Sequence, residues 1–368
     1  MTLSPDGQVF EWPAVLAAAM SSAGASPQAL SWAMSQMLED AATPAQVAAL
    51  VTAVRTRGET PEQLRALLEG MLAHAVLIDP DTRPQVVVDV VGTGGDGSNS
   101  VNISTMAALV VAAAGAPVIK HGSRAASSAT GSADVLELLG VDIQASGDQV
   151  ARSAREVGIG FCFAPSFHPA LRFVGPTRRE LKVPTIFNIL GPLANPARPE
   201  AMLVGCSRLE SAPTMAEVLR ERGVRALVIR GLDGLDEIST AGPTSVWNGI
   251  GDAVIEEVVD PQEWGVAQVD ARILEGSSAQ ENADVVGGVL DPAQRGSIAA
   301  GRREAIADAV AVNAAAALVA YDAATGVRPT GSLSESIGAA LPRARSALDS
   351  GAAWQVLQRW IEVSQRSD

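Results

Sequence analysis

The stretch Val86-Val87-Val88-Asp89-Val90-Val91-Gly92-Thr93-Gly94-Gly95-Asp96-Gly97 decides the fold class of this chain. Its first half is a short β-branched run, typical of a buried strand, and its glycines predict a tight loop where that strand ends. N-terminal to it, up to the turn-rich segment 79–84, the pattern predicts helices. Behind it, predicted strands alternate with predicted helices, which indicates an α/β domain with a central, mostly parallel sheet.

Capping signals mark the helices in the first eighty residues. Thr43-Pro44-Ala45-Gln46 and Thr60-Pro61-Glu62-Gln63 each place a threonine before a first-turn proline, with a glutamine three residues after the threonine. Another helix is expected to start near Ser26-Pro27. These short amphipathic helices predict a small all-helical domain over residues 10–80.

The rest of the chain carries short apolar runs and stretches with helical periodicity. Further strands are expected at Pro117–Lys120, Ile159–Ala164, Ala201–Cys206, Arg225–Arg230 and Ala253–Val258, and helices at Thr105–Ala114, Ser132–Leu139, Pro213–Arg222 and Arg303–Ala323. The stretch 172–199, rich in proline and arginine, interrupts this alternation, and we expect it to complete the helical domain. The α/β domain then comprises residues 85–171 and 200–365.

Composition sets limits on the function. The chain has 368 residues, 47% hydrophobic and 18% charged, a globular profile with room for two domains. Its net charge of −14 argues against a nucleic-acid partner, because phosphate backbones repel such a surface. The two cysteines, Cys162 and Cys206, stand far apart in apolar runs and predict neither a disulfide nor a zinc site. With no leader pattern and no apolar run of roughly 18 residues, we expect a cytoplasmic protein without a membrane partner.

The glycine loop formally matches the dinucleotide-binding pattern G-x-G-x-x-G at 92–97. Two details count against that function. In that motif the helix begins at the third glycine, but here Ser98-Asn99-Ser100-Val101-Asn102 intervenes. The next predicted strand ends in Lys120-His121, and not in the acid that would hold a ribose hydroxyl.

A phosphate cradle is the better interpretation of this loop. Glycines let backbone amides approach phosphate oxygens, and Asn102, Ser104 and Thr105 add donors at the start of a helix. Asp96 would repel a bare phosphate, so its presence predicts a magnesium ion between carboxylate and phosphate. A plain glycine turn with a capping serine is the simpler alternative, but it gives Asp96 no role.

Several motifs, taken together, resemble one family. They are Gly92–Asp96, Asn102–Thr105, Lys120–Gly122, Arg124–Ser128, Arg178–Leu181, Phe187–Leu193 and Gly234–Glu237. In order and spacing they are similar to anthranilate phosphoribosyltransferases, and the likeness runs from about Trp12 to Trp360. The resemblance implies a two-domain nucleoside phosphorylase/phosphoribosyltransferase-like fold, a homodimer and a magnesium cofactor. It implies transfer of a phosphoribosyl group from 5-phosphoribosyl 1-pyrophosphate to anthranilate, in tryptophan biosynthesis.

The resemblance also implies roles for individual residues. The phosphoribosyl donor is expected to contact Gly92, Thr93, Gly94, Gly95, Asp96, Ser100, Asn102, Ile103, Ser104, Thr105, Lys120, Gly122, Ser123, Arg124, Ser127, Ser128 and Ser132. Anthranilate is expected at Gly92, His121, Ser123 and Arg178, where the guanidinium would pair with its carboxylate. Magnesium is expected at Ser104, Asp236, Glu237 and Asp96.

The departures from the family's pattern lie on the acceptor side. Ser123 stands where the family usually has an asparagine that touches both substrates, and Lys182 stands where it tends to have glycine. A related enzyme that uses another aromatic amine is therefore an alternative. Pyrimidine nucleoside phosphorylases share the fold, but they lack the adjacent pair Asp236-Glu237 in this context. A catalytically inactive relative that binds nucleic acid is opposed by the intact loop and by the negative charge.

Overall fold

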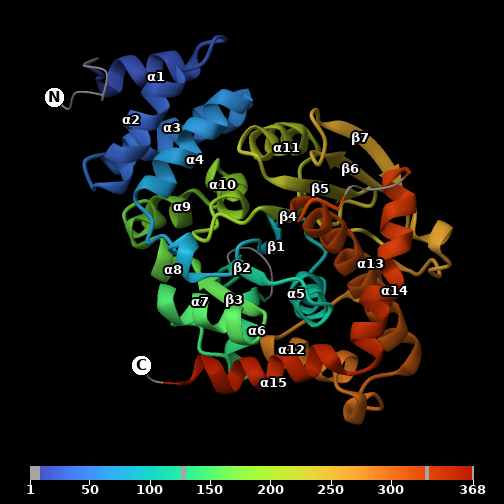
Figure 1. Ribbon diagram of the computed structural model, residues 1–368. Coiled ribbons are helices and arrows are strands. Elements are labelled where there is room, and N and C mark those ends of the chain that lie inside the picture. The colour runs from blue at the N-terminus through green and yellow to red at the C-terminus, as the bar shows by residue number, and fades with distance from the viewer. Residues whose placement is uncertain (1–8, 126–129, 328–330, 367–368) are drawn as a thin grey trace.

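The computed structural model describes residues 9–125, 130–327 and 331–366, and it combines helices with one central sheet (Figure 1). The strands are β1 (Val88–Gly92), β2 (Val118–Gly122), β3 (Ile159–Phe163), β4 (Ala201–Gly205), β5 (Arg225–Gly231), β6 (Thr244–Asn248) and β7 (Ile255–Val259). Their order across the sheet is β3-β2-β1-β4-β5-β6-β7. The first five strands pair in parallel, and β6 and β7 are antiparallel. The predicted fold class, with its central and mostly parallel sheet, is confirmed.

Two differences from the predicted strands have structural causes. The first strand begins at Val88 and not at Val86, because the backbone N–H of Val87 donates to the carboxylate of Glu200 (3.0 Å) outside the ladder. Strand β6 was not predicted at all. It pairs with β5 and β7, so its position depends on partners distant in the sequence as well as on its own residues.

The N-terminal part is helical, as the capping signals predict. The helices are α1 (Trp12–Met20), α2 (Pro27–Leu38), α3 (Pro44–Arg57) and α4 (Pro61–Ala73). Thr43 and Thr60 both form full capping boxes: each threonine hydroxyl accepts from the glutamine N–H three residues on, and the glutamine side chain accepts from the threonine N–H. These caps satisfy donors that the first helical turn leaves without a partner.

The remaining α-helices follow the strands. They are α5 (Ile103–Ala113), α6 (Ser132–Leu138), α7 (Gly147–Glu156), α8 (Ala164–Phe167), α9 (Gly175–Leu181), α10 (Phe187–Leu193), α11 (Ala212–Glu221), α12 (Ala279–Leu290), α13 (Ala300–Ala324), α14 (Leu333–Asp349) and α15 (Ala352–Ser364). The sequence did not predict α1, α7, α8, α12, α14 or α15. Each of these packs on other elements of the fold.

Helices cover both faces of the sheet. Helices α5 and α13 pack on one face, with α14 and α15 behind them, and α7 and α11 pack on the other (Figure 1). By length and composition α13 is the one helix within the described ranges that could cross a membrane, but most of it lies buried among α5, α14 and the sheet. Its 25 residues therefore form the central core helix of the larger layer.

The stretch that interrupts the α/β alternation packs beside the N-terminal helices. Helix α9 contacts α3, and α10 contacts α4 (Figure 1). Val174, Phe187 and Leu190 belong to the same buried cluster as Leu64 and Leu68 of α4. Apolar burial therefore fixes α9 and α10 on the N-terminal helices, above the ends of the parallel strands.

A buried polar contact joins this stretch to the sheet. The carboxylate of Asp89, on β1, accepts from the side chain of Asn195 (2.8 Å) and from the backbone N–H of His121 (3.3 Å). Asn195 follows α10, and its amide also donates to the carbonyl of Ile119 (2.7 Å). Burial raises the pKa of Asp89 to about 6, so the carboxylate depends on these donors when it is ionised.

We predict that Asn195→Ala lowers the free energy of unfolding by about 3 kcal/mol, because it leaves a buried carboxylate without its best donor. Urea denaturation at pH 7.5 measures the change. Asn248→Ala is the matched control, since Asn248 lies half-buried at the end of β6 and its side-chain amide donates to Glu257 (2.8 Å). An equal decrease in the free energy of unfolding for the two variants would show that the buried Asp89–Asn195 contact stabilises the fold no more than an ordinary surface hydrogen bond.

Candidate active site

A cavity of about 630 Å³ lies at the carboxyl ends of the parallel strands, beneath the inserted helices. The predicted site residues that line it are Gly92, Thr93, Gly94, Gly95, Asp96, Ser100, Asn102, Ser104, Lys120, His121, Gly122, Ser123, Arg124, Ser132, Arg178, Asp236 and Glu237. Ile103 and Thr105 are buried in the first turn of α5 and do not line it. Ser127 and Ser128 lie outside the described residues.

Topology puts the cavity at this place. Strands β1 and β4 are neighbours, and the chain leaves β1 toward β2 on one side but leaves β4 toward β5 on the other. The loops after these two strands diverge, which opens the crevice where α/β sheets bind ligands. The glycine loop follows β1, and the Asp236-Glu237 pair follows β5.

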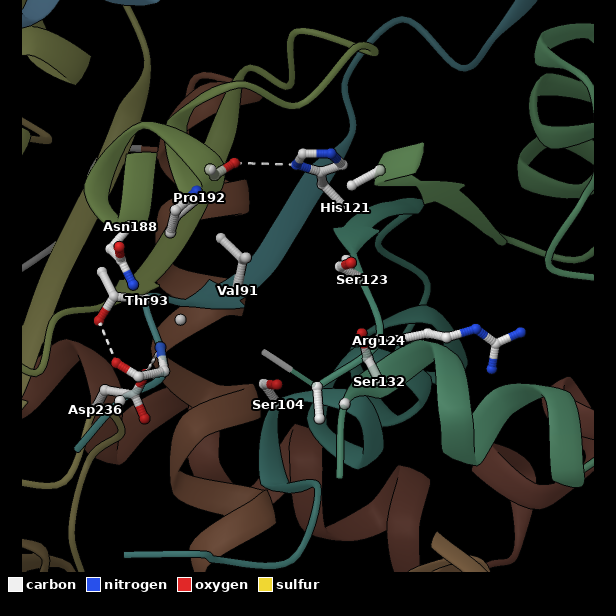
Figure 2. A pocket seen from close by; sticks show the side chains of 18 of the residues that line it. Val91, Thr93, Ser104, His121, Ser123, Arg124, Ser132, Asn188, Pro192 and Asp236 are labelled. Atoms are coloured by element: carbon white, nitrogen blue, oxygen red, sulfur yellow. Dashed lines mark hydrogen bonds between the residues drawn. The ribbon is translucent and has the colours of Figure 1, made fainter. Parts of the chain in front are cut away.

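The glycine loop is held by side chains from two other strand ends. The backbone N–H of Gly94 donates to the carboxylate of Asp236 (2.7 Å), and the hydroxyl of Ser207 donates to the carbonyl of Gly94 (2.9 Å). Ser207 also donates its own backbone N–H to the hydroxyl of Thr93 (3.0 Å). Figure 2 shows Thr93 and Asp236 together on one side of the cavity.

Two glycines are required by the close approach of Asp236. A Cβ at Gly205 would lie 1.6 Å from the backbone oxygen of Asp236, and a Cβ at Gly92 would lie 2.4 Å from its carboxylate. Gly92 and Gly205 are directly paired in the β1–β4 ladder. The absence of two side chains at one point of the sheet thus makes room for the carboxylate.

Three carboxylates converge beside the loop. Asp96, Asp236 and Glu237 can each offer one oxygen within 4.8 Å of the others. Burial and the charge of Asp96 raise the pKa of Asp236 to about 6, and burial together with Asp236 raises the pKa of Glu237 well above its usual range. One buried oxygen of Glu237 has no hydrogen-bond partner among the described residues. Such a set of hard, mutually repelling oxygens fits a divalent cation such as magnesium.

Lys120 lies under the cradle. It is buried, and its ammonium donates to the carbonyl of Val90 and to the hydroxyl of Ser104 (3.3 Å for the latter). Burial lowers the pKa of Lys120, while Asp89 and Glu237 act in the opposite direction. The lysine therefore places a positive charge between the carboxylates and the start of α5.

The wall opposite the glycine loop contains two neutral histidines. His121 donates from Nδ1 to the carbonyl of Gly191 (3.1 Å), as Figure 2 shows, and His168 donates from Nε2 to the carbonyl of Ala194 (2.9 Å). The two rings are 5.2 Å apart between centroids. Burial lowers the pKa of His121 to about 3 and that of His168 to about 4, so both are uncharged at neutral pH.

Arg178 supplies a charge on the same side of the cavity. It is half-buried on α9, with its guanidinium 5.1 Å from the centroid of the Phe187 ring. Burial alone lowers its pKa, and no carboxylate contributes to that shift. The guanidinium stays charged, because the ordinary arginine pKa is far above neutrality. A carboxylate on a flat ring is a suitable partner for it.

Arg124 is turned away from the cavity centre in Figure 2. Its guanidinium pairs with Asp134 (3.0 Å) and Glu137 (2.8 Å) at the surface. Its neighbour Ser123 lines the cavity and accepts, through its carbonyl, the backbone N–H of Ala133 (3.3 Å). The predicted role of Arg124 in donor binding therefore requires its side chain to leave two acids.

Comparison with known proteins identifies the family. Residues 14–75 match the helical bundle domain of the glycosyl transferase family, and residues 84–354 match its a/b domain. The anthranilate phosphoribosyltransferase of Nocardia farcinica is 51% identical over 334 residues, which cover 90% of this chain and 93% of the relative. The chain belongs to the anthranilate phosphoribosyltransferase family.

Other anthranilate phosphoribosyltransferases agree with this assignment. That of Rhodococcus jostii is 48% identical, across 96% of this chain and 93% of the relative. The crystal structure of the Thermus thermophilus enzyme superposes with a TM-score of 0.83 at 36% identity, covering 96% of this chain and 99% of that one. The structure of the Saccharomyces cerevisiae enzyme in complex with PRPP and Mg superposes with a TM-score of 0.81 at 27% identity, covering 96% of this chain and 97% of that one. The dinucleotide-binding and nucleoside phosphorylase alternatives are set aside.

The sequence did not predict the residues that hold the backbone around this anthranilate phosphoribosyltransferase site. Ser207 holds the glycine loop, and Asn313 of α13 accepts the backbone N–H of Ile238 (2.9 Å), next to the acidic pair. Asn282 of α12 lines the cavity. None of the three belongs to a motif that was recognised in the sequence, and their distance along the chain hides their role.

We predict that Gly205→Ala costs about 3 kcal/mol of unfolding free energy or prevents folding, because its Cβ would overlap the Asp236 backbone. Gly242→Ala is the control, since no heavy atom of the described residues lies within 4 Å of a Cβ at that position. Thermal unfolding followed by circular dichroism distinguishes the two variants. A Gly205→Ala protein as stable as the control would contradict the close approach of Asp236.

Proposed function

We propose that this chain transfers the phosphoribosyl group of 5-phosphoribosyl 1-pyrophosphate to the amine of anthranilate, giving N-(5-phosphoribosyl)anthranilate and pyrophosphate, as a step of tryptophan biosynthesis. The observation that carries this proposal is one cavity with two chemically different ends. One end has a glycine cradle with three carboxylates, and the other has a half-buried arginine beside neutral rings. Full-length similarity to named anthranilate phosphoribosyltransferases supports the same substrates.

The donor end suits a pyrophosphate that leaves with its charge neutralised. Asp96, Asp236 and Glu237 would hold magnesium, which, when bound, offsets the charge on the phosphate oxygens. The chain itself contributes the backbone amides of 95–97, the start of α5 and the positive charge of Lys120. These groups are fixed before the substrate arrives, so they stabilise the developing negative charge without reorganisation.

The acceptor end suits a flat, neutral nucleophile that carries a carboxylate. Arg178 would pair with the carboxylate, and His121 and His168 would flank the ring without adding charge. The amine nitrogen forms a bond to the anomeric carbon as the bond to pyrophosphate oxygen breaks, and the nitrogen then loses a proton. An aromatic amine is already neutral at pH 7, so orientation and exclusion of water contribute more than a general base.

We also propose that the protein is a cytoplasmic homodimer. Support comes from α1, whose nine residues are all apolar although only Val15 and Ala19 are buried. Phe10 and Trp12 pack against Trp32 on the same part of the molecule, with their rings tilted to the Trp32 ring. Sedimentation velocity of the purified chain decides between monomer and dimer, and a monomer at micromolar concentration would contradict the dimer.

Loss of anthranilate fluorescence tests the proposed reaction directly. Purified protein, 5-phosphoribosyl 1-pyrophosphate and magnesium should remove the signal, and omission of either the donor or the metal should preserve it. If the protein binds the donor but leaves anthranilate unchanged, then the acceptor is a different aromatic amine, and Ser123 is the residue to pursue. Failure to bind the donor at all would reject the proposed function.

We predict that Arg178→Ala raises the KM for anthranilate about 100-fold, because a charged hydrogen-bonding partner is lost, while the KM for the donor changes less than about threefold. Steady-state kinetics with each substrate varied in turn measures both constants. Arg155→Ala is the control, since that side chain is exposed on α7 and does not line the cavity. A similar effect of the two variants would reject Arg178 as the partner of the acceptor carboxylate.

We predict opposite effects of Asp236→Asn on stability and on metal use. The amide oxygen can still accept from Gly94, but a buried charge and its repulsion from Asp96 disappear, so the metal-free protein should gain about 1–2 kcal/mol. The magnesium concentration for half-maximal activity should rise at least tenfold. Chemical denaturation with chelator and a magnesium titration of activity give the two quantities. A variant that is both less stable and unchanged in its magnesium requirement would show that Asp236 is structural.

A further inference from the structure

Asn282 is a buried amide in the wall of the cavity. It lies on the first turn of α12, only 2% of its surface is exposed, and it lines the cavity together with Asn102. The two residues are 180 positions apart in the sequence, and they meet because the segment before α12 runs along residues 99–101, which follow the glycine loop. Val101 donates its N–H to the carbonyl of Leu274 (2.8 Å), and Gly276 donates to the carbonyl of Asn99 (2.8 Å).

The hydrogen bonds of Asn282 have a defined direction. The backbone N–H of Ser277 donates to Oδ1 of Asn282 (3.1 Å). A backbone N–H can only donate, so the atom that faces it must be the amide oxygen. The other end of the amide is then Nδ2, which donates to Oδ1 of Asn102 (2.9 Å). The orientation of the first amide therefore fixes the orientation of the second.

This direction leaves a specific group of Asn102 for a ligand. With Oδ1 of Asn102 occupied by Asn282, the other end of that amide is Nδ2, a donor. Asn102 is also the N-cap residue of α5, and its side chain makes no capping hydrogen bond within the described residues. An asparagine at this position ordinarily accepts from an N–H of the first helical turn. Asn282 holds the side chain in another direction. The N–H groups of Ile103 and Thr105 donate to backbone carbonyls, and the N–H of Ser104 is left available for an anion among the described residues.

The turn before α12 is built to hold Asn282 in place. A Cβ at Gly276 would lie 2.3 Å from Oδ1 of Asn282, so only glycine allows this approach. The hydroxyl of Thr130 donates to the carbonyl of Ser277 (3.0 Å), which ties the same turn to the loop after β2. The turn therefore contacts both loops that border the donor end of the cavity.

We propose that Asn282 is a positioning residue for the phosphoribosyl donor. It turns the amide of Asn102 so that Nδ2 faces the anionic part of the donor, and it prevents Asn102 from capping α5. The inference rests on the proposed function, since it requires Asn102 to contact the donor. A purely structural Asn282 would instead serve only to hold the 274–278 turn.

Asn282→Asp separates these two roles. The carboxylate still accepts from Ser277, so the turn is kept, but it cannot donate to Asn102. We expect the affinity for the donor in the presence of magnesium, measured by calorimetry, to fall about tenfold. The KM for anthranilate at saturating donor should change less than twofold. In an Asn102→Ala background, the same substitution should cost less than a further twofold, because the group it orients is absent.

Two further variants complete the test. Gln280→Asp adds the same charge on an exposed position of α12, and it should leave donor affinity within twofold of the original. If Asn282→Asp does not fold, then Asn282→Ala takes its place in the same cycle, with the same expected dependence on Asn102. The inference would be overturned if donor affinity fell equally in the original and the Asn102→Ala backgrounds, or if it did not fall at all. An unsubstituted protein that fails to bind the donor would instead overturn the proposed function.

Discussion

The active site depends on one close contact, the approach of Asp236 to the ends of β1 and β4. The contact exists because Gly92 and Gly205, paired in the ladder, both lack a side chain at that point. Through it, the carboxylate accepts from the backbone N–H of Gly94 and holds the glycine loop. The same contact brings Asp236 and Glu237 beside Asp96, so the shape of the cradle and the position of the acids are one feature of the fold.

Holding three acids together is unfavourable in the protein alone. Burial and mutual repulsion raise the pKa values of Asp236 and Glu237, and ionisation of either group near neutrality costs stability. Hydrogen bonds around the acids hold the neighbouring backbone in place: Asn313 accepts from the N–H of Ile238, and Ser207 donates to the carbonyl of Gly94. A site that binds a cation well is therefore less stable without it.

Features that depend on residues close together in the sequence could be predicted. The strand before the glycine loop, the threonine caps of α3 and α4, and the grouping of Asp236 with Glu237 are all visible in neighbouring residues. Strand β6 was missed because its position depends on the strands on both sides. Ser207 and Asn282 were missed for a related reason, since each acts on a residue more than a hundred positions away. Such contacts arise from the packing of the sheet and cannot be read from spacing.

The net negative charge of the molecule has a consequence for how an anionic donor can bind. A net charge of −14 repels a pyrophosphate at long range, so attraction must come from groups within the cavity. Lys120 provides positive charge at the donor end and Arg178 at the other end, while the histidines on the same side as Arg178 remain neutral because burial disfavours their charged forms. A protonated histidine there would compete with Arg178 for the acceptor carboxylate, and the acceptor could then bind in more than one orientation. Because the rings are neutral, the half-buried Arg178 would orient the acceptor carboxylate without competition from a charged histidine, and a cation at the three acids would orient the donor.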